Sequence, residues 1–96
     1  MHLEWSVFAR ADRQAIFDYI EEDNPRAAIT VDERIRTRVE DLAQFPEMGR
    51  PGRIEGTREL VVSDTPYIAA YRIVGDTVRI LRVLHGAQQW PETLPD

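Results

Sequence analysis

The chain has 96 residues, a length that suits one domain, and 43% of them are hydrophobic and 30% charged, as in ordinary globular proteins. The absence of cysteine excludes disulfides, thiolate catalysis and cysteine-ligated zinc, and it makes the reducing cytoplasm the expected location. The N-terminal residues lack the basic and apolar regions of a signal peptide, and no apolar run reaches the roughly 20 residues that span a bilayer, so we expect no membrane association.

The charges are unevenly distributed. All 12 basic residues are arginine, and the formal net charge is −5. Residues 1–48 contain 6 arginines and 11 acidic residues, whereas residues 49–96 contain 6 of each. An anionic partner would therefore meet the C-terminal half, where forked guanidinium groups suit carboxylates or phosphates. The acidic balance of the whole chain is unlike that of a general nucleic-acid binder.

The N-terminal half is predicted to be a short strand followed by two helices. Residues 2–6 alternate apolar and polar side chains, as strands do. Ser6 is the expected N-cap of a first helix that ends in the acidic run 21–23. Asn24-Pro25 predicts the start of a second helix, which continues to about Phe45. Because so little separates the helices, we expect an antiparallel hairpin.

The C-terminal half is predicted to be a loop followed by three strands. Three glycines and two prolines punctuate the loop, residues 46–56. The hydrophobic period then changes to two, which predicts strands at 58–63, 67–74 and 77–85. Gly75-Asp76 forms the expected tight turn between the last two strands. The last strand is the most apolar and should lie inside the sheet, and residues 86–96 should be irregular.

The predicted order β-α-α-β-β-β defines an α+β fold in a single domain, residues 1–96. The helical hairpin should pack on one face of a small, mainly antiparallel sheet, since each element must bury its apolar side. No helix remains to cover the other face. We therefore expect that face to be open, and we expect function to lie on an arginine-bearing sheet that binds macromolecules.

The candidate functional residues come from the loop and the three C-terminal strands. They are Arg50, Arg53, Arg58, Tyr67, Tyr71, Arg72, Arg79, Arg82 and His85. Strict alternation puts Arg82 on one face with Ile80 and Leu84 and puts His85 on the other with Leu81 and Val83, although a β-bulge would change this assignment.

Arginines and a histidine could together cleave RNA without a metal. His85 would act as base or acid, and Arg58 would stabilise the charge on phosphorus. The simpler alternative is that His85 makes local hydrogen bonds, that Tyr67 and Tyr71 pack within the sheet, and that the arginines form ion pairs. The partners expected for Arg58 and Arg82 in that case are Glu55, Glu59 or an acidic residue of a helix.

No metal or cofactor is expected. His2 and His85 alone cannot specify a metal site. The sequence also lacks a phosphate-binding glycine motif, a nucleophile elbow and a paired-carboxylate signature.

Several stretches, in the same order along nearly the whole chain, resemble the RelE/ParE superfamily of type II toxin–antitoxin toxins. The stretches are 3–6, 18–25, 45–52, 56–61, 67–73 and 80–86. The resemblance implies a β-α-α-β-β-β toxin that is held inactive by an antitoxin in a hetero-oligomer.

The superfamily contains two activities. In toxins similar to RelE and YoeB, which cut mRNA on the ribosome, the catalytic positions correspond to Arg58, Tyr71 and His85. Here Gly86 replaces the aromatic residue that follows the histidine, and a chain of charge −5 is poorly suited to docking on rRNA. Toxins similar to ParE bind DNA gyrase and trap it on cleaved DNA without catalytic residues.

The Gly-Arg-Pro stretch at 49–51 and the Leu-His-Gly stretch at 84–86 are closer to the ParE branch. We therefore favour a gyrase inhibitor that is not an enzyme. The alternatives are a ribosome-dependent mRNA endoribonuclease that uses Arg58 and His85, and a family member that binds its antitoxin but is no longer toxic.

The antitoxin should contact the basic part of the sheet. A disordered antitoxin segment that folds on binding would place carboxylates against it. The residues expected to bind the antitoxin or the target are Arg50, Arg53, Arg58, Arg72 and Arg82, and we expect the last three to hold the carboxylates.

Overall fold

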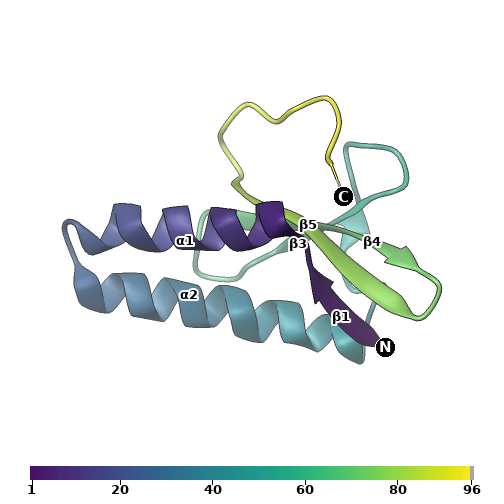
Figure 1. Cartoon of the computed structure of the whole chain (residues 1–96), viewed down its shortest axis with the longest axis horizontal. Coiled ribbons are helices and arrows are strands. Elements are labelled where there is room, and N and C mark those ends of the chain that lie inside the picture. Colours follow the sequence, from purple (N-terminus) through teal and green to yellow (C-terminus); the bar gives the residue numbers. More distant parts are fainter. Residues whose placement is uncertain (96) are drawn as a thin grey trace.

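The computed structural model describes residues 1–95, which form two helices and a five-stranded sheet (Figure 1). The elements are β1 (His2–Trp5), α1 (Val7–Glu21), α2 (Pro25–Glu40), the 3-10 helix η1 (Asp41–Ala43), β2 (Arg50–Pro51), β3 (Arg58–Val61), β4 (Tyr67–Val74) and β5 (Thr77–His85). The strand order is β1-β5-β4-β3-β2; β1 is parallel to β5 and every other pair is antiparallel. The predicted α+β fold and the interior position of β5 are confirmed.

Both helices begin where the sequence predicts. The side chain of Ser6 accepts a hydrogen bond from the Ala9 N–H at 3.0 Å, and the side chain of Asn24 accepts one from the Ala27 N–H at 3.1 Å. The predicted end of the second helix, near Phe45, is wrong: α2 ends at Glu40 and tightens into η1. The helical backbone continues through η1 to Ala43, and Pro46 opposes a longer helix because its ring disfavours helical backbone at Phe45.

The loop predicted at 46–56 contains a short strand, so that prediction is wrong in part. Arg50 and Pro51 of β2 pair with Glu59 and Arg58 of β3. The proline fits there because β2 is an edge strand. At the other end, β3 stops at Val61, two residues earlier than predicted.

A β-bulge in β5 decides which side chains face the helices. Tyr71 pairs with Ile80 and Ala70 pairs with Arg82, which leaves Leu81 as the extra residue. Ile80 belongs to the core beneath the helices, whereas Leu81 lies in the cluster on the opposite face. The bulge therefore puts Ile80 and Val83 on the helix-covered face and Leu81 and Leu84 on the other, whereas the strict alternation predicted from the sequence, which grouped Ile80 with Leu84 and Leu81 with Val83, is wrong.

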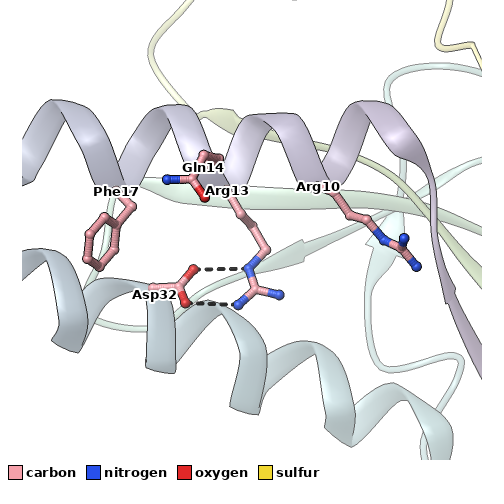
Figure 2. A pocket seen from close by; sticks show the side chains of 5 residues that line it. All are labelled: Arg10, Arg13, Gln14, Phe17 and Asp32. Atoms are coloured by element: carbon pink, nitrogen blue, oxygen red, sulfur yellow. Dashed lines mark hydrogen bonds and ion pairs between the residues drawn. The ribbon is translucent and has the colours of Figure 1, made fainter.

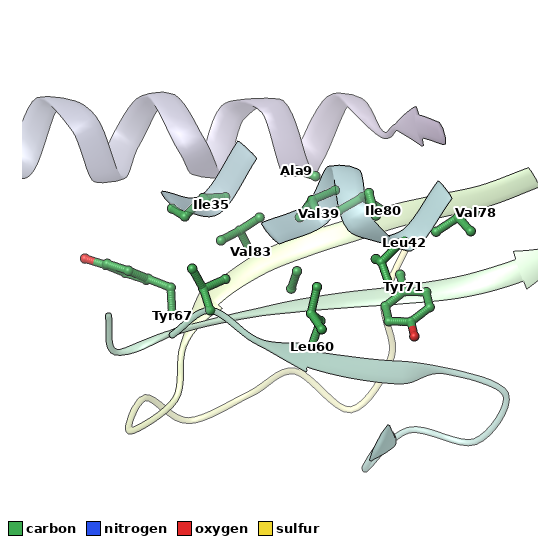
Figure 3. Close-up of a cluster of buried hydrophobic side chains, with 12 residues drawn as sticks. Ala9, Ile35, Val39, Leu42, Leu60, Tyr67, Tyr71, Val78, Ile80 and Val83 are labelled. Carbon is green, nitrogen blue, oxygen red and sulfur yellow. The ribbon is translucent and has the colours of Figure 1, made fainter. Parts of the chain in front are cut away.

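The helical hairpin covers one face of the sheet, as predicted, and encloses the main core (Figure 3). Buried residues of α1, α2, η1 and the strands β3, β4 and β5 meet here. They include Ala9, Ile35, Val39, Leu42, Leu60, Tyr67, Tyr71, Val78, Ile80 and Val83. No helix in the described residues, 1–95, is long and apolar enough to cross a membrane.

The second face of the sheet is also covered, so the prediction of an open face is wrong. The irregular tail after β5 arches back from the strand (Figure 1). Its Leu94, 7% exposed, packs with Ala70, Leu81 and Leu84, and Trp90 adds to this cluster. The apolar side chains on this face need a cover, and the tail provides one where no helix is left.

Candidate functional site on the loop, strands and tail

A buried carboxylate organises the arginines of the loop. The Glu59 side chain is only 2% exposed, and it accepts hydrogen bonds from Arg50 Nη2 at 3.0 Å and from Arg53 Nε at 3.0 Å. The Arg53 backbone N–H donates a further bond at 2.8 Å. The Arg53 guanidinium also stacks on Trp90, 3.7 Å from the ring centroid. The loop, β3 and the tail are thus joined at one point.

The Glu59 carboxylate remains ionised at neutral pH. Burial by itself raises the pKa of Glu59, but the hydrogen bonds from Arg53 and Arg50 more than compensate, and the net effect is a lowered pKa. The side chains of Arg50 and Arg53 remain 54% and 41% exposed. Their outward donors can therefore still reach an acceptor on a partner.

Arg58 and Tyr71 hold the chain that leads into β2. Arg58 Nη1 donates to the Gly49 carbonyl at 2.7 Å and to the Glu47 carbonyl at 3.3 Å. Tyr71 is fully buried; its hydroxyl donates to the Pro46 carbonyl at 2.7 Å and accepts from the Gly49 N–H at 2.9 Å. A Cβ at Gly49 would lie 2.6 Å from that hydroxyl oxygen, so only glycine fits.

Arg58 and Arg72 come together at a surface hollow of about 420 Å³. Its lining residues are Glu47, Pro51, Gly56, Thr57, Arg58, Arg72 and Ile73. Predicted antitoxin-binding arginines of two neighbouring strands, β3 and β4, thus face a common space here. The hollow adjoins the loop that carries Arg50 and Arg53.

Arg82 and Arg79 are paired with acidic residues of the N-terminal elements. Arg82 donates two hydrogen bonds to Asp12 of α1, at 2.7 and 2.9 Å, and Asp12 also accepts from the Val83 N–H at 2.9 Å. Asp12 thus provides an acceptor for a main-chain N–H at the edge of β5, beyond the residues that pair with β1. Its hydrogen bonds to the guanidinium raise the pKa of Arg82. Arg79 forms an ion pair with Glu4. The helix-acid alternative for Arg82 is confirmed.

His85 makes local contacts at the far end of the sheet. Its Nδ1 accepts a hydrogen bond from the Ala87 N–H at 3.0 Å, and its ring meets the Tyr67 ring edge-on with centroids 5.6 Å apart. Together with Tyr19 these rings line a hollow of about 350 Å³. The local-bonding alternative for His85 is confirmed.

His85 lies far from the other two residues of the predicted catalytic set, Arg58 and Tyr71. Arg58 pairs with Tyr71 and His85 pairs with Tyr67, on opposite sides of β4 and four residues apart along it. At about 3.3 Å per residue and about 4.8 Å between strands, the Arg58 and His85 backbones lie roughly 16 Å apart. They line two different hollows, and Tyr71 faces neither.

Sequence reasoning assigned one of the acidic residues that fix the arginines, Glu59, to the wrong partners and did not single out the other, Asp12. Glu59 was expected to pair with Arg58 or Arg82, but it binds Arg50 and Arg53. A carboxylate next to apolar residues within a predicted strand, as Glu59 is before Leu60 and Val61, could have indicated a buried ion cluster. Asp12 lies 70 residues before Arg82, and no local pattern signals that contact.

A further hollow, about 390 Å³, lies on the helical hairpin and contains none of the predicted residues. Figure 2 shows Arg13 of α1 joined to Asp32 of α2 across it, with Phe17 and Gln14 alongside. Arg13 also stacks on Trp5. Through these two contacts, Arg13 connects α1 and α2 with Trp5 of β1. Within residues 1–95, no group of three His, Asp or Glu side chains could hold a metal ion.

Comparison with known proteins identifies the family. The family model for the ParE toxin of the type II toxin–antitoxin system parDE matches residues 3–90. The chain belongs to the ParE toxin family. It is a type II toxin of the ParE/RelE kind, as the resemblance in the sequence implied.

Individual relatives of this ParE-family toxin span nearly its whole length. The proposed toxin Y4kP of Sinorhizobium fredii is 51% identical, with 96% of this chain and 95% of Y4kP covered. Toxin RelE2 of Caulobacter vibrioides is 39% identical, with 88% and 93% covered. Relatives of this toxin therefore carry names from the RelE side of the superfamily as well.

Two solved structures share the fold of the toxin. A chain of the chromosomal ParDE system from P. aeruginosa superimposes with a TM-score of 0.82 at 31% identity, with 88% of this chain and 95% of that chain covered. A chain of the RelBE2 toxin–antitoxin complex from Mycobacterium tuberculosis gives 0.57 at 29% identity with the same coverage. The two helices on a five-stranded sheet are thus the ParDE toxin fold.

Proposed function

We propose that this ParE-family toxin inhibits DNA gyrase by direct binding and is neutralised by a cognate antitoxin in the cytoplasm. The observation that carries the choice of target is the separation of His85 from Arg58 and Tyr71. General acid–base catalysis needs its groups within hydrogen-bond reach of one substrate, and these groups line separate hollows or are buried.

The charge of the toxin supports the same choice. A net charge of −5 opposes docking on rRNA, which depends on neutralising phosphates. Most of its arginines on the sheet already bind carboxylates of the same chain, including Glu59, Asp12 and Glu4. A protein target such as gyrase makes no comparable demand for free positive charge.

The antitoxin is proposed to bind at two neighbouring arginine-bearing surfaces, the half-exposed loop arginines and the hollow lined by Arg58 and Arg72. The printed names of the structural neighbours, ParDE and RelBE2, describe toxin–antitoxin systems. Arg50 and Arg53 are half-exposed, and Arg58 and Arg72 share a surface hollow, so antitoxin carboxylates can reach all four. Arg82 is held by Asp12, and its contribution should come mainly through the position of α1.

Calorimetry tests the antitoxin contact. Replacing Arg58 and Arg72 with alanine should weaken binding of the antitoxin encoded in the adjacent reading frame by about tenfold or more, given 1.5–3 kcal/mol for a hydrogen bond to a charged group. Arg36→Ala is the control, because Arg36 bonds only Glu40 one turn along α2. If both variants lost the same antitoxin affinity, Arg58 and Arg72 would not be specific contacts of the antitoxin.

Induced expression tests the target. A gyrase inhibitor should switch on the DNA-damage response before translation falls, and His85→Gln should leave the toxicity intact. If His85→Gln abolishes toxicity while antitoxin binding persists, the toxin is instead a ribonuclease. Translation arrest with cleaved mRNA and no DNA-damage response would lead to the same conclusion.

A further inference from the structure

Strand β1 forms the edge of the sheet that lies opposite the arginine-bearing loop. The strand order β1-β5-β4-β3-β2 gives β1 a single neighbour, β5, and places β2 at the other edge. The outer side of β1 therefore has no strand beside it within residues 1–95. Arg50 and Arg53, which we assign to the antitoxin, lie at the far end of the sheet from this edge.

The main chain of β1 alternates between β5 and the open edge. The His2 N–H donates to the Asp76 carbonyl at 2.9 Å, and the N–H of Ser6 donates to β5 in the same way, so the even-numbered residues face β5. Successive residues of a strand point their main-chain groups to opposite sides. Leu3 and Trp5 therefore direct their N–H groups out of the sheet, where no strand of residues 1–95 can accept them.

The side chains of β1 form an apolar set and a polar set on opposite faces. Leu3 and Trp5 pack against the main core beneath the helices. His2 and Glu4 project from the other face, and their side chains are 79% and 57% exposed. Glu4 uses one carboxylate oxygen in its ion pair with Arg79, which leaves the second oxygen for a partner.

Only a few registers are open to two copies of β1 that pair antiparallel about a two-fold axis. A hydrogen-bonded pair needs two outward-facing residues, so Leu3 must lie opposite Leu3, Trp5 or Met1 of the second copy. With Leu3 opposite Trp5, the two Glu4 side chains meet, and like charges directly opposite are destabilising. With Leu3 opposite Met1, the two His2 side chains meet and the strands overlap less. With Leu3 opposite Leu3, each His2 lies opposite the Glu4 of the other copy.

We propose that two copies of the toxin associate through β1, in the register that places Leu3 opposite Leu3, and thereby join their sheets across a two-fold axis. Main-chain hydrogen bonds at Leu3 and Trp5, contact between the Leu3 side chains and the His2–Glu4 pairs would hold this isologous interface. The arginine-bearing loops would lie at the two outer ends of the joined sheet, where an antitoxin can still reach them. The association does not depend on which target the toxin inhibits.

The pattern of β1 favours a copy of itself as the occupant of this edge. A basic and an acidic side chain, His2 and Glu4, lie on either side of Leu3, so the same strand in the reverse direction supplies the complement of each. The net charge of −5 opposes association, but charges more than about 8 Å apart are largely screened at physiological salt. Because β1 has only 4 residues, the contact is small, and we expect a weak dimer that forms at high concentration.

Sedimentation equilibrium of the free toxin tests the association, and amide hydrogen exchange locates it. The fraction of dimer should rise with concentration, and exchange of the Leu3 and Trp5 amides should slow in proportion to that fraction. The amides of the loop between β2 and β3, at the other edge, should keep their rates. A toxin that stays monomeric at every concentration, or a dimer in which the Leu3 and Trp5 amides exchange as fast as in the monomer, overturns the proposal. Neither result bears on gyrase inhibition, which is measured separately.

Charge substitutions at His2 test the register. His2→Arg should tighten the dimer and His2→Glu should weaken it, each by about threefold or more, because the side chain faces Glu4 of the second copy on both sides of the axis. The exposed position of His2 makes both variants compatible with the fold. Ser63→Arg and Ser63→Glu change the net charge equally at an exposed position after β3, and they should leave the dimer unchanged. If the two His2 variants shift the dissociation constant no more than the Ser63 variants, or both in the same direction, the proposal is overturned.

Discussion

The two faces of the sheet are closed by different means. On one, α1 and α2 bury a continuous apolar core that includes Ile35 and Ile80. On the other, an irregular tail places Leu94 over a small cluster, and the remaining contacts are the Glu59 ion cluster and the stacking of Arg53 on Trp90. Apolar burial without polar groups stabilises a fold most securely, because no desolvation has to be compensated. The helical face should therefore determine global stability, and the tail-covered face should open first.

The largest effect is expected on the helical face. Ile80 is fully buried beneath the helices, so Ile80→Ala should lower the free energy of unfolding by about 3 kcal/mol through lost burial and the cavity left behind. Urea denaturation of the purified toxin measures this. If Ile80→Ala lowered the free energy of unfolding by less than a substitution on the tail-covered face does, the helical face would not determine global stability.

The next effect concerns the ion cluster. Glu59→Gln should cost about 2 kcal/mol at pH 7, the scale of hydrogen bonds to a charged group. Because the pKa of folded Glu59 lies below its usual 4.5, this stabilisation is present above pH 4.5 and is lost as the pH falls through the folded pKa. The difference in the free energy of unfolding between wild type and Glu59→Gln should therefore become smaller at acidic pH. Glu55→Gln, at an exposed loop position, is the control, and a gap that is the same at all pH values would contradict the assignment.

A smaller effect is expected at the tail. Leu94→Ala should cost about 1.5 kcal/mol, less than for a fully enclosed leucine, because a chain end can relax around the lost side chain. Protease cleavage within the tail should become faster than in the exposed-site control Thr93→Ala. If Leu94→Ala lowered the free energy of unfolding as much as Ile80→Ala does, the two faces would contribute equally to global stability.

The smallest effect is expected at Asp12. Asp12→Asn keeps an acceptor for the Val83 N–H but weakens the pair with Arg82, so the free energy of unfolding should fall by about 1 kcal/mol. Thermal unfolding measures the change against Asp18→Asn, whose carboxylate bonds only Gln14 one turn away. Equal melting temperatures for the two variants would mean that the helix does not depend on this contact.

Local chemistry made much of the fold predictable. Ser6 and Asn24 fixed the helix starts because a cap is a contact over three residues, and the change of period identified β3 to β5. The extra residue Leu81 and the pairing of Arg82 with Asp12 depend on contacts between distant segments, which leave no periodic trace. The site was predicted as a set of free arginines because positive charge is visible in a sequence, whereas the burial of Glu59 that engages two of them is not.

The target of the toxin is tested most directly with purified gyrase. The account predicts that the toxin blocks supercoiling and accumulates cleaved DNA, that the antitoxin prevents both effects, and that His85→Gln, once shown to fold, retains the inhibition. Gyrase that is unaffected by the wild-type toxin, together with cleavage of ribosome-bound mRNA that His85→Gln abolishes, would contradict it.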